Sequence, residues 1–408
     1  MAKVKYWIWL STRKGLGPVG ALRLLEQLQT PEQIYFADPE HYGLVEGLPN
    51  TAHTSLRDKD MSGVEKILGD CDRLGLRIMT LQDADYPERL RNISDPPLVL
   101  YIRGRMPVFD EEVAIGVVGT RNPTQYGMTM AAKLGYELAR GGAVVVSGIA
   151  KGLDAAALRG ALNAGGTVVS VLGGGTDVYY PRENRYLYDD VAACGALITE
   201  YPPGTENKGP HFPIRNRIIS GLCQGVVAVE CEERSGTMST MNRAWDQDRD
   251  LFAVPGPVGA PKSKGPNDLI QNGAKLVRCG EDILMEYRSL FPTKLDSAPE
   301  LVGRAQEQRM EEAVKDWIQE PEPAKPESAK YADGRELVRR EDERERFTDD
   351  ELAVLRALGE KQRSTDELVE LTQIPVRRVT TALTMLQVDG AVQEGTGRRF
   401  SALVRLED

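Results

Sequence analysis

Short apolar runs alternate with amphipathic helical patterns through the middle of the chain. Runs such as 113–118, 143–146 and 167–172 are built almost entirely from Val, Ala, Ile, Leu and Gly, and each precedes a stretch with apolar positions at helical spacing. Continuous apolar strands that alternate with helices are typical of a parallel sheet covered on both faces. The pattern therefore predicts an α/β fold, a Rossmann-like doubly wound parallel sheet, over residues 105–290.

The individual elements follow from the same pattern. The predicted strands are 98–102, 113–118, 143–146, 167–172, 196–199, 226–230, 251–254 and 275–277. The predicted helices are 127–140, 153–164, 184–193, 238–246 and a further one within 211–222.

The N-terminal segment, residues 1–75, has the pattern of small helices. Gly15-Leu16-Gly17-Pro18 separates two short helical stretches, as in a SAM/helix-hairpin-helix-like domain. Such a turn either contacts phosphate through its amides or simply joins two packed helices, and the sequence leaves both interpretations open. Residues 76–104 are predicted to form a connector, in which Asp95-Pro96-Pro97 forces an extended bend before the next strand.

The C-terminal third changes in composition. Residues 291–346 are rich in Pro, Glu, Lys and Arg, which predicts a charged linker. Residues 347–408 then show three helical patterns and a hairpin, the order of a winged helix. This segment holds eight Lys and Arg against eleven Asp and Glu, a net of −3. Four arginines suit duplex DNA, but the acidic balance suits a protein contact, and both interpretations stay open; these arginines are Arg377, Arg378, Arg398 and Arg399.

Overall charge and cysteine usage narrow the class of protein. The 408 residues carry a net charge of −10, so contact with nucleic acid requires a local basic patch. Five scattered Cys without C-x-x-C and three His argue against a disulfide frame or a metal site. The chain shows no signal peptide and no apolar run of bilayer length, which predicts a cytoplasmic protein without membrane contact. No cofactor is predicted.

Polar or glycine-rich turns follow five of the predicted strands. The carboxyl ends of parallel strands meet at one edge of a sheet, where ligands of doubly wound proteins bind. The five turns bring basic side chains to that edge, namely Arg121, Lys151, Arg215, Arg217 and Arg234. Glycine amides, helix dipoles and these cations together predict an anionic ligand.

One stretch concentrates the chemistry. His211 to Leu222 reads HFPIRNRIISGL, in which an aromatic side chain and two arginines precede an apolar helical pattern. Cations and an aromatic ring at a helix N-terminus suit a phosphate chain with a base attached. The same arginines also suit a buried network of ion pairs, so the stretch alone leaves two interpretations open.

The motifs of common enzymes are absent from the sequence. It contains no Walker-type phosphate loop, no G-x-G-x-x-G after the first strand and no G-x-S-x-G elbow. Glu230 is a candidate general base, but pairing with a neighbouring arginine is the alternative. We therefore expect no catalytic residues and no enzymatic turnover.

Several segments resemble the DNA-processing protein A (DprA/Smf) family. They are YPERLRNISDPPLVLYIRG, VVGTR, SGIAKGLDAAALRGAL, VLGGGTDVYYPREN and FPIRNRIISGL, with VVAVE, RSGT, FAVPGPV and KGPNDLIQNGA following in order. The resemblance spans residues 80–280. It implies a protein that binds single-stranded DNA, forms a homodimer through the Rossmann-like domain and loads RecA during natural transformation.

The resemblance also assigns roles to residues. It implies that Arg121, Arg215 and Arg217 contact the DNA backbone, that the Ser147-Gly148 turn provides amides, and that Phe212 stacks on a base. Two positions depart from the family pattern: Leu158 replaces a histidine, and Gly209 replaces a lysine, with Lys208 beside it. The full set of predicted DNA-binding residues is Arg121, Ser147, Gly148, Lys151, Lys208, Phe212, Arg215, Asn216 and Arg217. Asn216 is expected mainly to hold the turn that aims the arginines.

Two other functions remain as alternatives. One is an enzyme that cleaves nucleoside monophosphates on a similar sheet, with RSGTMST and Glu230 as its site. The other is a protein scaffold, in which the basic edge has no ligand.

Overall fold

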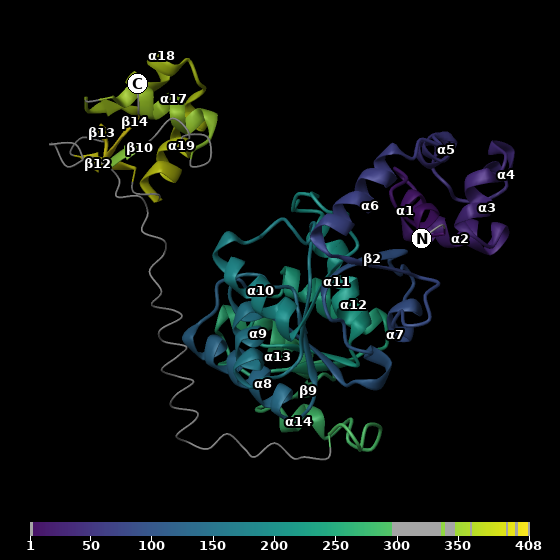
Figure 1. Ribbon diagram of the computed structural model, residues 1–408. Coiled ribbons are helices and arrows are strands. Elements are labelled where there is room, and N and C mark those ends of the chain that lie inside the picture. Colours follow the sequence, from purple (N-terminus) through teal and green to yellow (C-terminus); the bar gives the residue numbers. More distant parts are fainter. Residues whose placement is uncertain are drawn as a thin grey trace. The chain divides into compact units, whose positions relative to one another are not determined.

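The computed structural model describes residues 3–295, 336–338, 347–359, 361–388, 391–395 and 399–406. The chain forms two compact units, Met1–Trp317 and Ile318–Asp408 (Figure 1). Most of the predicted linker, 291–346, lies outside the described residues. The five-segment division of the chain stays a prediction.

The first unit is built on one nine-stranded sheet. Its strand order is β1-β2-β6-β5-β4-β3-β7-β8-β9. The strands are β1 (Arg77–Thr80), β2 (Val99–Gly104), β3 (Ala114–Val118), β4 (Val144–Ser147), β5 (Val168–Val171), β6 (Gly195–Thr199), β7 (Gly225–Ala228), β8 (Asp250–Ala253) and β9 (Lys275–Leu276). Across the sheet, every neighbouring pair from β6 through β5, β4, β3, β7 and β8 to β9 is parallel, which confirms the doubly wound sheet. Strands β1 and β2 are antiparallel additions from the predicted connector.

Helices cover both faces of this sheet. The helices that follow β3, β4 and β5 pack on one face, and those that follow β6 and β7 pack on the other (Figure 1). The first group is α8 (Gln125–Arg140), α9 (Leu153–Asn163) and α10 (Arg185–Cys194), and the second is α11 (His211–Leu222) and α12 (Gly236–Asp246). The side chains of Thr124 and Ser235 cap α8 and α12, because each accepts a hydrogen bond from a backbone amide in the first turn of its helix.

Several short elements complete the unit. They are α7 (Glu88–Arg91), α13 (Pro261–Gln271), α14 (Glu281–Leu284) and the 3₁₀ turns Phe109–Glu111 and Arg182–Asn184. Helix α13 is absent from the sequence prediction because Gly265 and Pro266 interrupt its helical pattern. The chain changes the direction of its crossovers between β3 and β7, so the crevice at their carboxyl ends is the topological switch point.

The N-terminal helices share a core with the sheet. They are α1 (Val4–Ser11), α2 (Gly17–Leu28), α3 (Pro31–Phe36), α4 (Pro39–Gly43), α5 (Asn50–Arg57) and α6 (Ser62–Leu74). Gly15 and Gly17 both have positive φ, which explains why glycine occupies the turn between α1 and α2. Buried Trp9 and Leu24 belong to the same apolar cluster as Ile219 of α11. The N-terminal segment therefore packs continuously with the α11 side of the sheet.

The second unit confirms the predicted winged helix. Its helices are α17 (Asp349–Leu358), α18 (Thr365–Thr372) and α19 (Val376–Val388), and its strands are β10 (Glu336–Val338), β11 (Arg363–Ser364), β12 (Val392–Gly395), β13 (Arg399–Ala402) and β14 (Val404–Leu406). Capping boxes at Thr348 and Ser364 begin α17 and α18. Each N-cap hydroxyl accepts the amide of a glutamate three residues later, and that glutamate's carboxylate accepts the amide of the N-cap residue. Strand β10 lies within the segment predicted as linker and pairs with β14.

Candidate functional site

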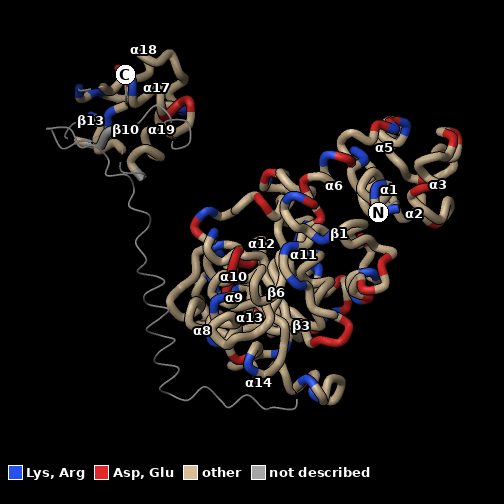
Figure 2. Tube along the Cα trace, viewed as in Figure 1, with Lys and Arg blue, Asp and Glu red and all other residues tan. Residues whose placement is uncertain are grey.

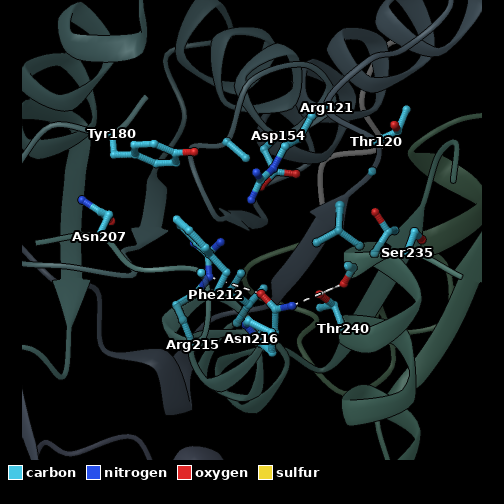
Figure 3. Close-up of a pocket in the computed structure, with 18 residues that line it drawn as sticks. Thr120, Arg121, Asp154, Tyr180, Asn207, Phe212, Arg215, Asn216, Ser235 and Thr240 are labelled. Atoms are coloured by element: carbon cyan, nitrogen blue, oxygen red, sulfur yellow. Dashed lines mark hydrogen bonds between the residues drawn. The ribbon is translucent and has the colours of Figure 1, made fainter. Parts of the chain in front are cut away.

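A cavity of about 610 Å³ opens at the carboxyl edge of the sheet, at the switch point (Figure 3). Its wall comes from the turns after β3 and β4, the loops before α10 and α11, the first two turns of α11 and the start of α12. We call this space the α11 cavity. Its position confirms that the strand-end turns meet at one edge, as the sequence predicted.

Phe212 is the aromatic centre of the α11 cavity. The guanidinium carbon of Arg121 lies 5.1 Å from its ring centroid and that of Arg215 lies 5.9 Å away. Tyr180 lies on another side, with ring centroids 5.4 Å apart. A side chain at Gly173 would begin 3.1 Å from the Phe212 ring, so the glycine turn after β5 allows the close approach. Two cations and two aromatic rings thus share one wall.

Arg215 is buried, although its side chain reaches the α11 cavity. Its Nη1 donates to the carbonyls of Gly148, at 2.9 Å, and of Val171, and its Nε donates to Asn216 at 3.3 Å. Within the described part of the chain, Nη2 has no hydrogen-bond partner. Burial lowers the pKa of Arg215, and the nearby carboxylate of Asp154 partly offsets that effect. The buried guanidinium therefore lacks a full set of partners, which an anion would complete.

Asp154 organises the turns behind Arg215. Its carboxylate accepts the amide of Gly148 at 3.1 Å, and the amides of Ala150 and Gly119 bond to it as well. Burial raises the pKa of Asp154, while Arg215 and these amides act in the opposite direction. One carboxylate thus ties the turns after β3 and β4 together.

The Ser147-Gly148 turn faces inward rather than toward the cavity. The Ser147 hydroxyl is fully buried and donates to the carbonyl of Val117 at 2.7 Å. The Gly148 amide, which was expected to face a ligand, is already donated to Asp154. Neither residue lines the α11 cavity. The Ser147 side chain points to the neighbouring strand β3, and the Gly148 carbonyl accepts a hydrogen bond from Nη1 of Arg215.

Arg217 occupies the ion-pair network that the sequence left as an alternative. It is 1% exposed, and its Nη1 and Nη2 bond both oxygens of Glu200 at 3.0 and 2.7 Å. Asp95 of the connector lies 3.2 Å from Nε. Burial acts to lower the pKa of Arg217, but the two carboxylates raise it overall. The ion-pair interpretation of the stretch therefore holds for Arg217, and the phosphate interpretation stays a prediction for Arg215.

The remaining predicted residues lie in or beside the cavity wall. Asn216 lines it and donates to the carbonyl of Gly236 at 3.3 Å, which ties α11 to α12. Lys151 and Lys208 are exposed and do not line the cavity, although each adjoins a lining residue in sequence, Ala150 and Asn207 respectively. Acidic and basic positions are interspersed over the unit (Figure 2), so the cations of this wall form a local feature.

Sequence reasoning missed two contributors to the α11 cavity, namely Tyr180 and Asn207. Tyr180 and Asn207 come from long loops and meet Phe212 only in the folded chain. The aromatic pair in GGGTDVYYP was the one available signal.

Glu230 pairs with no arginine among the residues that the structure describes. Its carboxylate accepts the amide of Thr124 at 2.9 Å and the Thr124 hydroxyl, so it sits at the N-terminus of α8. It lines a neighbouring cavity with Tyr126 and Pro255 and is not part of the α11 cavity wall. The pairing predicted for Glu230 with an arginine is therefore wrong, and the helix N-terminus is its partner.

Ion pairs engage two of the four candidate arginines of the winged helix. Arg378 forms two hydrogen bonds with Asp350, at 2.8 and 2.6 Å, and Arg399 pairs with Glu367 at 2.7 Å. Arg377 is exposed, and Arg398 lies outside the described residues. Contact with duplex DNA or with protein both stay predictions for this unit.

The part of the chain that the structure describes gives no sign of a metal or membrane site. It contains no cluster of three or more His, Cys, Asp or Glu placed to hold a metal ion. None of its helices combines the length and apolar character that crossing a bilayer requires.

The fold and the α11 cavity together define a doubly wound α/β protein with a cavity at the switch point that is lined by cations and aromatic rings. Known proteins agree with this fold. The family described as DNA recombination-mediator protein A matches residues 77–288, and the DprA winged helix domain matches residues 320–398. The chain belongs to the DNA-processing protein A (DprA/Smf) family.

Individual relatives support the same assignment. The chain is 42% identical to the DNA processing protein DprA of Bacillus subtilis over 221 residues, which is 54% of this chain and 74% of that one. It is 30% identical to Protein Smf of Synechocystis over 410 residues, covering 97% and 98% of the two chains. The X-ray structure of DprA from Streptococcus pneumoniae superimposes with a TM-score of 0.62 at 34% identity, covering 69% of this chain and 97% of that one.

Proposed function

We propose that this protein binds single-stranded DNA in the α11 cavity. A base stacks on Phe212, the adjoining phosphate pairs with Arg215 and Arg121, and Tyr180 packs on the same base or its neighbour. Single strands are commonly held by a basic groove and stacking rings without reading of base edges. The binding is therefore expected to tolerate different sequences.

The single observation that carries the proposal is the state of Arg215. Its side chain is held by Nη1 and Nε, whereas Nη2 has no hydrogen-bond partner among the described residues and opens to the cavity beside an aromatic ring. A guanidinium fixed in this way is positioned to pair with a phosphate oxygen at Nη2. The relatives named DNA processing proteins point to a nucleic acid as the source of that phosphate.

Different predicted residues take different roles in this proposal. Arg121, Phe212 and Arg215 touch the strand, and Lys151 and Lys208 attract its backbone from the mouth of the cavity. Ser147, Gly148, Asn216 and Arg217 act indirectly, because their contacts hold α11 and Arg215 in place. The net charge of −10 makes this local cluster necessary for any attraction of DNA.

We further propose that the protein acts without enzymatic turnover. It protects incoming single-stranded DNA and loads RecA onto it as a cytoplasmic homodimer that pairs through the Rossmann-like domain. These parts of the proposal rest on the family and on its description as a recombination mediator. The position of Glu230 outside the α11 cavity also speaks against the nucleotide-cleaving alternative.

The test is the affinity for a fluorescein-labelled oligothymidine, measured by anisotropy. Arg121→Met and Arg215→Met each remove one cation and should weaken binding about tenfold, which corresponds to about 1.4 kcal/mol. Arg140→Met is the matched control, because Arg140 is exposed at the opposite end of α8, at the other edge of the sheet.

Folding of each variant is checked by its thermal unfolding midpoint. Arg121 is exposed, so its variant separates DNA contact from stability even if Arg215→Met unfolds. Equal affinities for Arg121→Met, Arg140→Met and the unchanged protein would refute the proposal. Release of free base from nucleoside monophosphates would instead support the enzyme.

A further inference from the structure

The α11 cavity opens beside Tyr180, which lines it and is 43% exposed (Figure 3). From Tyr180 the chain runs into the 3₁₀ turn Arg182–Asn184 and then into α10. Buried Tyr188 of α10 fixes this connection, because its hydroxyl donates to the Tyr180 carbonyl at 2.9 Å and accepts the Tyr180 amide at 3.1 Å. The start of α10 is therefore held beside the mouth of the cavity.

Residues 179–186, YYPRENRY, differ in composition from the acidic chain around them. They contain three tyrosines and two arginines but only one acidic residue, Glu183, whereas the whole protein carries a net charge of −10. Arg182 and Arg185 are both exposed, and neither forms an ion pair with any residue that the structure describes. Exposed cations without carboxylate partners are free to neutralise phosphates.

Two pairs of arginine and tyrosine flank the start of α10. The guanidinium carbon of Arg185 lies 5.1 Å from the ring centroid of Tyr179, and that of Arg159 in α9 lies 4.8 Å from the centroid of Tyr186. The two pairs lie next to each other, because Arg185 and Tyr186 are consecutive. Tyr186 is 42% exposed, so part of its ring stays accessible beside Arg159. The arrangement repeats that of cations around Phe212 in the α11 cavity.

The turn between β4 and α9 adds a further cation. Asn184 donates to the carbonyl of Ile149 at 2.9 Å, which places the 3₁₀ turn against the turn that carries Lys151. Lys151 is exposed and has no ion pair within the described part of the chain. Helices α9 and α10 lie side by side in Figure 1. We use the name α10 surface for Lys151, Arg159 and residues 179–186 together.

We infer that the α10 surface binds a second segment of the DNA strand where the strand leaves the α11 cavity. This inference rests on the proposed binding of single-stranded DNA in that cavity. A base stacks on the ring of Tyr186, as bases stack on exposed aromatic side chains in other single-strand sites. The phosphates between the two bound bases pair with Lys151, Arg182 and Arg185. The strand therefore runs from Phe212 past Tyr180 to the start of α10.

The acidic residues near α10 do not cancel this attraction. Asp189 pairs with Arg103 of β2, while Glu183 and Asp190 are exposed. The α10 surface has four basic residues against these two, so its net charge is positive. A local excess of positive charge is what an acidic protein needs to attract a polyanion.

The experiment compares two fluorescein-labelled oligothymidines, one of about four nucleotides and one of about twenty, the longer of which extends beyond a single site. Tyr186→Leu removes the ring but keeps an apolar side chain. It should weaken binding of the long strand about tenfold, within the range for stacking of one base, and leave the short strand unchanged. Trp245→Leu is the matched control, because Trp245 is 64% exposed at the far end of α12.

The two free arginines give a second and independent readout. Arg182→Met combined with Arg185→Met should make the salt dependence of long-strand binding less steep by about 1.4, as two phosphate contacts require, and leave that of the short strand unchanged. Both side chains are exposed, so the thermal midpoint should not change. Unchanged affinity and slope for the long strand would overturn the inference, and this is also the result expected if the α10 surface binds a protein.

Arg121→Met separates the inference from the proposed function, because Arg121 lines the α11 cavity and is not part of the α10 surface. It should weaken binding of both strands. If it does so while Tyr186→Leu weakens neither, DNA binds in the cavity and the α10 surface is refuted. If Arg121→Met changes neither strand, the proposed function and the path that leaves the cavity are both refuted.

Discussion

Gly148→Ala tests the placement of Arg215 without removing any charge. Gly148 is not at a positive φ, so its backbone accepts alanine. The new Cβ would lie 2.5 Å from Nη1 of Arg215 and 2.7 Å from Cζ and Nη2. Ordinary contact begins at 3.4 Å, so the guanidinium must move by about 0.9 Å, the difference between the ordinary and the built Nη1 distance. The carbonyls of Gly148 and Val171 currently hold it in place.

The expected loss follows from these contacts. A hydrogen bond to a charged group contributes about 1.5–3 kcal/mol, and a shift of this size weakens at least one of them. It also displaces Nη2, because the new Cβ would lie 2.7 Å from that nitrogen. We therefore expect affinity for single-stranded DNA to fall about tenfold or more, since about 1.4 kcal/mol corresponds to a factor of ten.

The assay is anisotropy with a labelled oligothymidine, with Gly69→Ala as the control. Gly69 lies in α6, and a Cβ there meets nothing within 4 Å. The thermal midpoint of Gly148→Ala reports whether the fold survives. A folded Gly148→Ala protein with unchanged affinity would refute the claim that Arg215 must hold its present position to bind DNA.

Three further predictions concern stability and reactivity. Arg217→Met should lower the free energy of unfolding by about 3 kcal/mol, the lower end of the range for breaking a buried ion pair, because it leaves the half-buried carboxylates of Glu200 and Asp95 without their cation. Urea unfolding should show partial recovery when Glu200→Gln is added, and equal losses in the single and double variants would contradict the pairing. Burial raises the pKa of Cys223 and of Cys231 to about 12, so both thiols stay protonated at pH 8. They should resist iodoacetamide in the folded protein, while the exposed Cys194 reacts. Peptide mapping that finds the buried thiols alkylated first would contradict this prediction. Thr348→Ala removes a capping box and should lower the protection of α17 amides against hydrogen exchange by about 1 kcal/mol. Thr384→Ala, on the exposed face of α19, should lower it less. Equal protection of α17 in the two variants would count against the cap.

The sequence predicted the sheet well because its signals are local. Each parallel strand is a short apolar run, and each helix that follows has apolar positions at helical spacing. The antiparallel pairing of β1 and β2 was not predicted, because no local pattern shows that a connector returns to the edge of a sheet. Helix α13 was missed because packing against β8 outweighs the effect of its internal proline.

Geometry explains which part of the candidate site the sequence predicted and which part it did not. Strand order brings Arg121, Phe212 and Arg215 to one cavity, as expected for the carboxyl edge of a parallel sheet. Arg215 and Arg217 were given the same role, yet residues two apart on a helix point about 200° apart. One therefore faces the cavity and the other faces Glu200 and Asp95. The helical period alone therefore predicts that the two arginines face different surroundings.

The salt dependence of binding tests the central claim most directly. For single strands, the logarithm of the binding constant falls with the logarithm of salt concentration by about 0.7 for each phosphate neutralised. If Arg121 and Arg215 each neutralise one phosphate, Arg121→Met combined with Arg215→Met should make the slope less steep by about 1.4, as two such contacts require. Arg140→Met should keep the original slope. A double variant with the original slope would show that the α11 cavity does not hold the DNA backbone.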